Sequence, residues 1–471
     1  MTVKNSIKPI CKSKPLTSEK SVSGSMLRRI RMQEHCEVYV CSGVNIERDD
    51  YVILTEWEVQ RPVMVNFVNS SIAKIPHLMF DLYPDLQAVN FDNCSVETFE
   101  RPQFEGARNL RIVYLNHNHL QEIPKQIFHG AEKLKELHLR DNQVHTLYNE
   151  SFQGLTHLRI LHLANNQLQE LPAGVFHALK KLELVDLAGN RLEWLPPAIF
   201  ERNKNLSEII LARNPLRVVD LSALLGRLLH IHLLDFSGII MHDLRLDFPP
   251  IVDRLWMNDC DLRSLSISVF VASLHLRNNS LREVPQPAHP ANITELDVSL
   301  NPLRSLHIKS FRRFTALQQL NLSFTQLDDL PEGIFKKQAH LSMLDISGNR
   351  LTSLKFLDQF FDSLKHLEEF HFAKNNWNCD FLQLMITTYV KRRRIRFNED
   401  SELPEFVDDY IQGIACWNSK QAVGGECSNR GEMETAMELA IVRNDIKSFM
   451  DEIDLKFVKV YRALEEIKLS L

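Results

Sequence analysis

Histidine and aspartate side chains recur at a fixed interval in the first half of the chain. His138, His162 and Asp186 lie 24 residues apart. On neighbouring strands of one sheet, about 4.8 Å apart, they would form a trio of transition-metal donors. The alternative is a solvated polar ladder that contacts a protein partner. We favour the ladder, because a flat open sheet supplies no enclosed fourth ligand and no groups behind the ligands. We therefore expect no metal and no cofactor.

Motifs of enzymes are missing from the sequence, which contains no P-loop, GxGxxG, HExxH or GxSxG pattern. Gly accounts for only 15 of 471 residues, so glycine-rich phosphate loops have little material. The chain has 55 Lys and Arg against 60 Asp and Glu, a net charge of −5, which argues against nucleic-acid binding. We expect a non-enzymatic protein with a protein partner.

The elements that position these residues come from a repeat of the form LxxLxLxxNxL. Its first positions keep a period of 24 at the start of the series and then become irregular, from 19 to 26. They are residues 62, 86, 110, 134, 158, 182, 206, 231, 252, 271, 293, 317, 341 and 367. The sequence predicts fourteen leucine-rich repeats over residues 62–378, with thinner coils between 221 and 292.

Each repeat position has a physical role. Alternation in xLxLx turns leucines such as Leu137 and Leu139 inward and leaves residues such as His138 outward, so each repeat adds a short parallel strand. The ninth residue, usually Asn, can satisfy backbone groups at the turn. A phenylalanine 18 residues after most repeat starts predicts a stacked aromatic column. The predicted fold is an α/β leucine-rich-repeat solenoid, a horseshoe with capped ends.

The outward residues of the strands form the predicted partner-binding concave face. Tyr114 and Trp256 are informative there, since aromatic residues anchor many interfaces. The alternative is that they pack against adjacent concave side chains. The predicted partner-binding residues are Tyr114, His138, His162, Asp186, Trp256 and His275.

Cysteines flank the repeats and predict disulfide caps. Cys36 and Cys41 precede the first repeat, in the predicted N-terminal cap 36–61, and Cys379 and Cys416 lie in the C-terminal cap 379–431. We expect a bridge within each pair. Zinc is the alternative, but Cys416 and Cys427 are too far apart in sequence for a close ligand pair.

The remaining cysteines have separate roles. Cys94 and Cys260 occupy the ninth repeat position, where a buried thiol replaces Asn. Cys427 is left unpaired between the cap and the C-terminal segment, so it is a candidate for an inter-chain bridge. Cys11 lies in residues 1–35, which carry eight Lys and Arg against two acidic residues and which we interpret as a basic disordered tail.

Seven N-x-S/T sequons favour an extracellular, glycosylated protein. No apolar segment of a signal peptide is visible in residues 1–35, so we expect the natural protein to begin at a different N-terminus from the one in this sequence. No stretch is apolar enough to span a membrane. Asn321 points from the middle of the concave face. The predicted glycosylation sites are Asn69, Asn93, Asn149, Asn205, Asn278, Asn292 and Asn321.

Residues 432–471 predict an amphipathic helix whose apolar residues follow 3,4 spacing through one stutter. Two interpretations remain open. The helix folds back onto the cap, or it forms a short coiled coil with a second chain as a homodimer or heterodimer.

Two resemblances narrow the function. LRILHLANNQLQELPAGVF is similar to animal extracellular leucine-rich-repeat proteins, and NNWNCDFLQLMI followed by QGIACW and a terminal helix resembles the mosquito leucine-rich immune protein family. The second resemblance implies disulfide-linked, coiled-coil-joined complexes, with Cys427 between chains and 432–471 pairing. It also implies a complement-like thioester protein as partner.

The resulting hypothesis is a secreted recognition or scaffold protein of innate immunity. One alternative is the ectodomain of a membrane leucine-rich-repeat receptor or adhesion protein. Another is an intracellular adaptor or enzyme inhibitor, which would require reduced caps.

Overall fold

The computed structural model describes residues 62–75, 79–100, 103–217, 221–226, 228–246, 251–288, 292–398 and 409–417, and the strand backbones at 10–15, 37–42 and 45–46. The chain clusters into two units, Met1–Cys416 and Trp417–Leu471. All elements below belong to the first unit. The predicted helix 432–471 and Cys427 lie outside the described residues.

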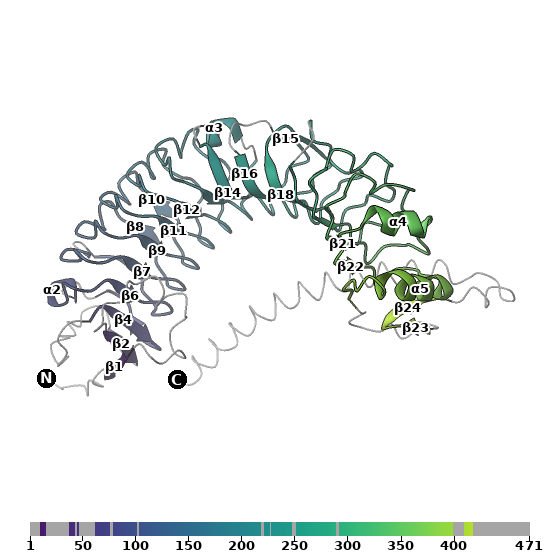
Figure 1. Cartoon of the computed structure of the whole chain (residues 1–471). Coiled ribbons are helices and arrows are strands. Elements are labelled where there is room, and N and C mark those ends of the chain that lie inside the picture. Colours follow the sequence, from purple (N-terminus) through teal and green to yellow (C-terminus); the bar gives the residue numbers. More distant parts are fainter. Residues whose placement is uncertain are drawn as a thin grey trace, which may run out of the picture. The chain divides into compact units, whose positions relative to one another are not determined.

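One long sheet runs through the first unit (Figure 1). Fourteen of its strands, from β4 to β22, pair in parallel, and each carries one repeat. Their bounds are β4 Met64–Val68, β6 Ala88–Asn90, β7 Ile112–Tyr114, β9 Glu136–His138, β11 Ile160–His162, β12 Leu184–Asp186, β13 Glu208–Ile210, β14 His230–Asp235, β16 Ile251–Trp256, β18 Val271–His275, β19 Glu295–Asp297, β20 Gln319–Asn321, β21 Met343–Asp345 and β22 Glu369–His371. The predicted leucine-rich-repeat solenoid is confirmed.

The register of the sheet aligns the repeats without slippage. Tyr114 pairs with His138, His138 with His162, and His162 with Asp186. Trp256 pairs with Asp235 on one side and His275 on the other. The fifth position of every repeat therefore lies in one column along the inner side of the arc.

The core fills the coil behind the sheet. Inward residues such as Leu137 and Leu139 are fully buried. The phenylalanine column stacks as predicted, with ring centroids of Phe104 and Phe128 5.1 Å apart and those of Phe176 and Phe200 5.7 Å apart. Because each coil buries its apolar side only against its neighbours, this column ties successive coils together.

The turn after each strand explains why the ninth residue of the repeat is usually Asn. Residue eight has a positive φ in all fourteen repeats, for example 54° at Asp141 and 55° at Asn165. Asn, Asp and Gly tolerate this left-handed backbone best. The next residue is then turned inward, and the side chain of Asn142 donates to the carbonyl of Leu115 at 2.8 Å while its oxygen accepts from the Leu120 amide at 3.1 Å.

Outside the sheet the coils return by short elements. These are α2 Met79–Leu82, α3 Leu221–Leu225, α4 Leu357–Ser363, β5 Ser71–Ile72, which pairs with β3 Asn45–Ile46, and β8 Glu122–Ile123, which pairs with β10 Thr146–Leu147. In the predicted thinner region, β15 Asp243–Leu246 and β17 Ser264–Ile267 pair in parallel. A shorter repeat leaves room for an extended return strand and not for a helical turn.

The N-terminal end of the sheet continues past the repeats. β2 Glu37–Ser42 pairs in parallel with β4, and β1 Ile10–Pro15 pairs with β2 in antiparallel orientation. The interpretation of residues 1–35 as wholly disordered is therefore wrong for 10–15, because β2 offers an unpaired edge whose backbone groups another strand can satisfy. Cys41 lies opposite Cys11 in this register. Cys36 lies outside the described residues, so the Cys36–Cys41 bridge stays a prediction.

The C-terminal cap closes the other end. It consists of α5 Cys379–Met385, the π-helix η2 Ile386–Val390, β23 Asp409–Ile411 and β24 Ile414–Cys416. The predicted Cys379–Cys416 bridge is present, with Cα atoms 5.0 Å apart. Trp377 is fully buried beneath the cap, and its indole N–H donates to the Phe372 carbonyl at 2.7 Å.

Candidate partner-binding surface

Three rings from adjacent strands stack along the concave column. The ring centroids of Tyr114 and His138 are 4.4 Å apart and those of His138 and His162 are 4.9 Å apart, with near-parallel planes. Tyr114 and His162 are half-buried and His138 is buried. The predicted residues are thus brought together, but they also pack against one another, as the alternative interpretation required.

Asp186 ends this stack and is buried. Its Oδ2 accepts from His162 Nδ1 at 3.2 Å and from Arg140 Nε at 3.1 Å, and its Oδ1 accepts from the Ala188 amide. Burial raises the pKa of the Asp186 carboxyl, but the hydrogen bonds from His162 and Arg140 outweigh it and hold the pKa below its usual value. Arg140 remains about half exposed, at 47% of its side chain, above this buried carboxylate.

We name Tyr114, His138, Arg140, His162 and Asp186 the concave strip. His138 Nε2 lies 3.3 Å from Glu136 Oε2, so its ring is held by its own strand. Within the described residues, one group of three metal-donor side chains converges, and it contains none of these residues. What the strip offers is aromatic edges, one exposed cation and flanking carboxylates, which suit contact with a protein.

Trp256 and His275 form a second cluster farther along the column. Their rings meet edge to face, with centroids 5.9 Å apart. Ser273 Oγ lies 2.9 Å from His275 Nε2 and donates to Glu295 Oε2 at 2.7 Å. Trp256 is half-buried, and its indole N–H has no hydrogen-bond partner in the described part of the chain.

A third cluster lies at the end of the column. His371 Nε2 is 2.8 Å from Glu369 Oε1 and its Nδ1 is 3.7 Å from Asp345 Oδ2. The neighbouring Asp345 carboxylate raises the pKa of His371 most, and partial burial opposes it. Arg396 from the cap pairs with Glu369 at 3.1 Å.

Sequence reasoning on the fifth position alone missed several of these residues. Glu136, Glu295 and Glu369 occupy position three of their repeats, and Arg140 occupies position seven. The same alternation that turns position five outward also turns these positions outward. The sequence therefore already indicated that positions three and seven, two residues before and after position five, also face outward.

The seven sequons differ in accessibility. Six of the asparagines are exposed, and Asn321 is half-buried on the concave face, where its oxygen accepts from the Ser323 amide at 2.9 Å. The exposed asparagines are Asn69, Asn93, Asn149, Asn205, Asn278 and Asn292.

The two ladder cysteines are free and buried, as expected. Cys260 Sγ donates to the Phe236 carbonyl at 3.3 Å, in the manner of the asparagine it replaces. Burial, with a smaller contribution from Asp92, raises the pKa of the Cys94 thiol to about 12, and burial raises that of Cys260 to about 11. Such thiols are unreactive.

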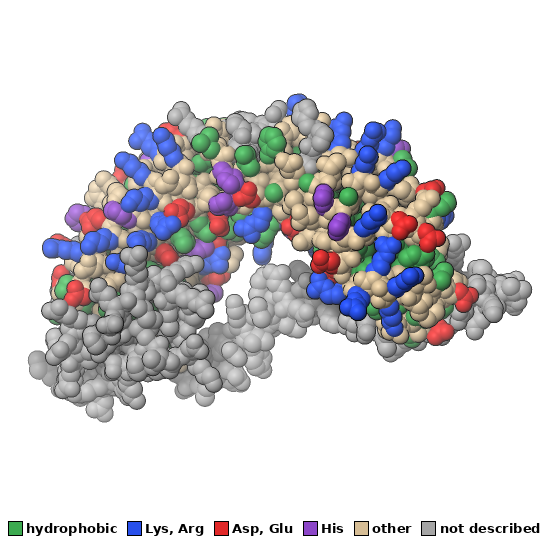
Figure 2. Space-filling model, viewed as in Figure 1, with side chains coloured by type: hydrophobic (Ala, Val, Ile, Leu, Met, Phe, Trp, Pro, Cys, Tyr) green, Lys and Arg blue, Asp and Glu red, His purple; other side chains and the backbone are tan. Residues whose placement is uncertain are grey.

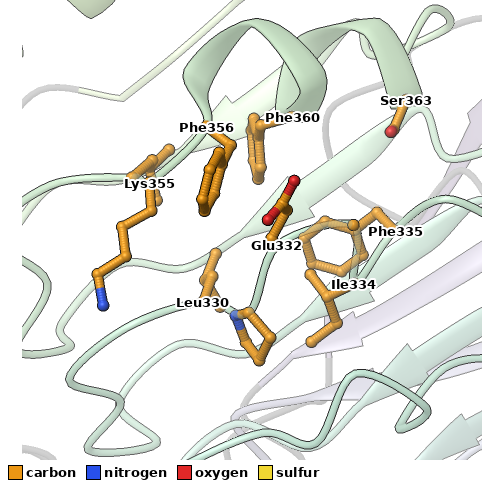
Figure 3. Close-up of a pocket in the computed structure, with 11 residues that line it drawn as sticks. Leu330, Glu332, Ile334, Phe335, Lys355, Phe356, Phe360 and Ser363 are labelled. Carbon is orange, nitrogen blue, oxygen red and sulfur yellow. The ribbon is translucent and has the colours of Figure 1, made fainter.

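A small pocket on the outer wall does not resemble an active site (Figure 3). Phe356 and Phe360 face Leu330 and Phe335 of the preceding coil, and the rings of Phe335 and Phe360 meet edge to face at 5.9 Å. Its lining is mainly apolar and contains no histidine or cysteine. We interpret it as packing space between coils.

Side chains of both charges are mixed over the face seen in Figure 2. In the described residues no helix is long and apolar enough to cross a bilayer.

Comparisons with known proteins agree with this geometry. The leucine rich repeat family model matches residues 108–168, 156–216 and 291–351. Osteomodulin of Rattus norvegicus is 26% identical over 160 residues, which make up 33% of this chain and 36% of that protein. This chain thus spans about a third of that relative's length.

Two solved structures share the fold. A chain of the LRIM1/APL1C complex matches with a TM-score of 0.52 and 20% identity, over 91% of this chain and 77% of that one. A chain of the TLR13–ssRNA13 complex matches with a TM-score of 0.54 and 22% identity, over 68% and 51%. With fourteen in-register repeat strands and three segments matched by the family model, the chain folds as a leucine-rich-repeat solenoid.

Proposed function

We propose that this chain is a non-enzymatic, secreted scaffold or recognition protein of innate immunity that binds a protein partner through its concave face. The observation that carries the proposal is the concave strip, in which Tyr114 and His162 are half-buried and Arg140 is half exposed on a rigid sheet. Amphipathic rings and arginine are the side chains that most often anchor protein interfaces. By resemblance to the mosquito leucine-rich immune proteins, the partner is a complement-like thioester protein.

The charge pattern of the strip favours a protein over a polyanion. Arg140 is offset by Asp186, and Glu136 lies beside His138. A nucleic-acid surface would instead need a continuous run of cations. Complementary mixed charges steer a specific partner and disfavour others.

An extracellular location is supported by two independent features. The Cys379–Cys416 bridge belongs to an oxidising compartment. Six sequon asparagines are exposed and therefore accessible to glycosylation. The C-terminal helix 432–471 adds, in this proposal, a second contact that joins the chain to a partner or to a copy of itself.

Capture from extracellular fluid tests the proposal. Wild-type protein and the double variant Tyr114→Ala, Arg140→Ala are immobilised, and bound chains are separated without reducing agent and identified by mass. Arg202→Ala with Lys204→Ala is the matched control, because both residues are exposed and lie outside the sheet. We expect a partner with wild type and control, and a loss of at least tenfold with the concave variant. Equal recovery with all three proteins would contradict the role of the concave strip.

A further inference from the structure

Two histidines and an aspartate meet where the repeats become short. β14 carries His230 and His232, two residues apart, so both side chains project from the same face of the strand. β16 pairs with β14 so that Ile231 is opposite Val252 and Leu233 is opposite Arg254. This register brings Asp253 beside His232.

The donor atoms of the three side chains converge. His230 Nε2 lies 2.8 Å from Asp253 Oδ1, and His232 Nδ1 lies 2.6 Å from Asp253 Oδ2. The donor atoms lie within 4.8 Å of one another. The two imidazole rings meet edge to face, with centroids 4.8 Å apart.

We propose that His230, His232 and Asp253 form a binding site for one divalent transition-metal ion of the zinc class. Zn²⁺ takes imidazole nitrogens at about 2.0–2.1 Å and carboxylate oxygens at about 2.0–2.2 Å, in tetrahedral geometry. Such distances require donor atoms about 3.3 Å apart, which lies between the shortest and longest separations found here. The ion would take the place of the hydrogen bonds that now join the carboxylate to the imidazoles, and water would supply the fourth ligand.

The supporting strands hold the three residues in place. The His232 amide donates to the Ser207 carbonyl at 2.7 Å, and the Ile251 amide donates to the Leu229 carbonyl at 3.1 Å. Sites on paired strands keep their ligands closer to the productive geometry than sites on loops do. About half of each imidazole surface is exposed, so an ion can reach the nitrogens directly.

Two other imidazole–carboxylate contacts, in turns of the solenoid, provide a comparison. His117 pairs with Asp141 at 3.4 Å, and His242 pairs with Asp261 at 3.1 Å. Each has one imidazole, whereas two imidazoles share Asp253. Among the described residues this is the one group that gathers three donor side chains. This group lies on β14 and β16, outside the central column, and shares no residue with the trio His138, His162 and Asp186 that the sequence suggested.

Calorimetry with Zn²⁺ tests the site. The full chain without an affinity tag is stripped with a chelator, desalted and titrated, alongside His230→Ala, His232→Ala, Asp253→Asn and the control His117→Ala. We expect one ion per chain for wild type and control, and a loss of affinity of at least about tenfold for each ligand variant, the loss seen when even a group behind a ligand is removed. No binding by wild type, or equal binding by wild type and Asp253→Asn, would overturn the proposal.

Two further measurements separate the site from other causes. Asp253→Asn keeps the shape of the side chain, so its thermal unfolding should match that of wild type. If a histidine variant does not fold, the zinc titration of Asp253→Asn alone decides whether the site exists. Co²⁺ in place of Zn²⁺ should give visible absorption without a thiolate charge-transfer band. Such a band that persisted in Asp253→Asn would assign the ion to cysteines and contradict the site.

Discussion

Replacing Asn166 by alanine should destabilise the solenoid at one identifiable hydrogen bond. The Asn166 amide nitrogen donates to the carbonyls of Leu139 at 2.9 Å, Leu163 at 3.0 Å and Ala164 at 3.2 Å, and its oxygen accepts from the Val144 amide at 2.9 Å. The three carbonyls keep a second donor each, from the side chains of neighbouring ladder asparagines or from a backbone amide. The buried Val144 N–H keeps none in the described part of the chain.

The expected loss of stability follows from the hydrogen bonds that Asn166→Ala removes. One orphaned buried donor costs about 1–3 kcal/mol, and the weakened hydrogen bonding at the carbonyls adds to it, so we expect a loss of about 2–4 kcal/mol in the free energy of unfolding. This is a large part of the 5–15 kcal/mol typical of folded domains. Asn109→Ala is the control, because Asn109 is only half-buried and its amide makes a solvent-exposed hydrogen bond to the Pro84 carbonyl at 3.0 Å.

Urea unfolding and hydrogen exchange together measure the effect. Exchange is needed because coils of a repeat protein can open locally without unfolding the whole array. We expect faster exchange in peptides that contain Val144 for Asn166→Ala and wild-type exchange for Asn109→Ala. Stability within about 0.5 kcal/mol of wild type, together with unchanged exchange at Val144, would refute the ladder argument.

Three other predictions concern charge, glycans and assembly. Because the pKa of Asp186 is lowered on folding, the stability that its carboxylate contributes is present above about pH 3.8 and is lost as pH falls through the lowered value. Between pH 5 and pH 3, thermal unfolding should therefore show a smaller loss of stability for Asp186→Asn than for wild type. An equal loss in both proteins would contradict this prediction. Glycopeptide mass spectrometry of the secreted protein should find glycans at Asn69 and Asn149 but not at the half-buried Asn321, and a fully occupied Asn321 would argue against the concave face as the binding surface. In sedimentation experiments the full chain should behave as an oligomer, and the chain without residues 432–471 should behave as a monomer. If both sediment as monomers, the oligomerisation claim is wrong.

Repeat periodicity was sufficient to predict the fold and the register of the concave column. Each repeat buries the leucine at its fourth position, as Leu137 does, and turns at residue eight. One correct assignment of repeat positions therefore places all fourteen strands. The Cys379–Cys416 bridge was also predictable, because both cysteines follow the last repeat and lie in the predicted cap.

The same regularity qualifies the interpretation of the sequons. Asn69, Asn93 and Asn278 occupy residue eight of their repeats, with φ of 49°, 56° and 52°. Asn is favoured at such positions for its tolerance of left-handed backbone. Part of the excess of sequons therefore has a structural origin, and the other three exposed asparagines, Asn149, Asn205 and Asn292, carry more of the inference of an extracellular protein.

Side-chain networks were less predictable than the strands. Arg140 reaches past β11 to Asp186 on β12, and His230 contacts Asp253 from an adjacent strand at a position before its repeat begins. Such contacts depend on rotamers and on the short repeats, where spacing alone does not say which positions converge. For Tyr114 and Trp256 the sequence left open whether the rings anchor a partner or pack on adjacent concave side chains, and in the structure both rings contact a neighbouring histidine.

A glycan placed on the concave strip tests the central claim most directly. Tyr114→Asn with Asn116→Thr creates a sequon on β7, and Arg202→Asn with Lys204→Thr creates one outside the sheet. After mass spectrometry has confirmed both glycans, partner capture from extracellular fluid is compared with wild type. Binding through the concave face predicts that the first glycan abolishes capture and the second leaves it intact. Full capture by the protein with the glycan on β7 would contradict the claim.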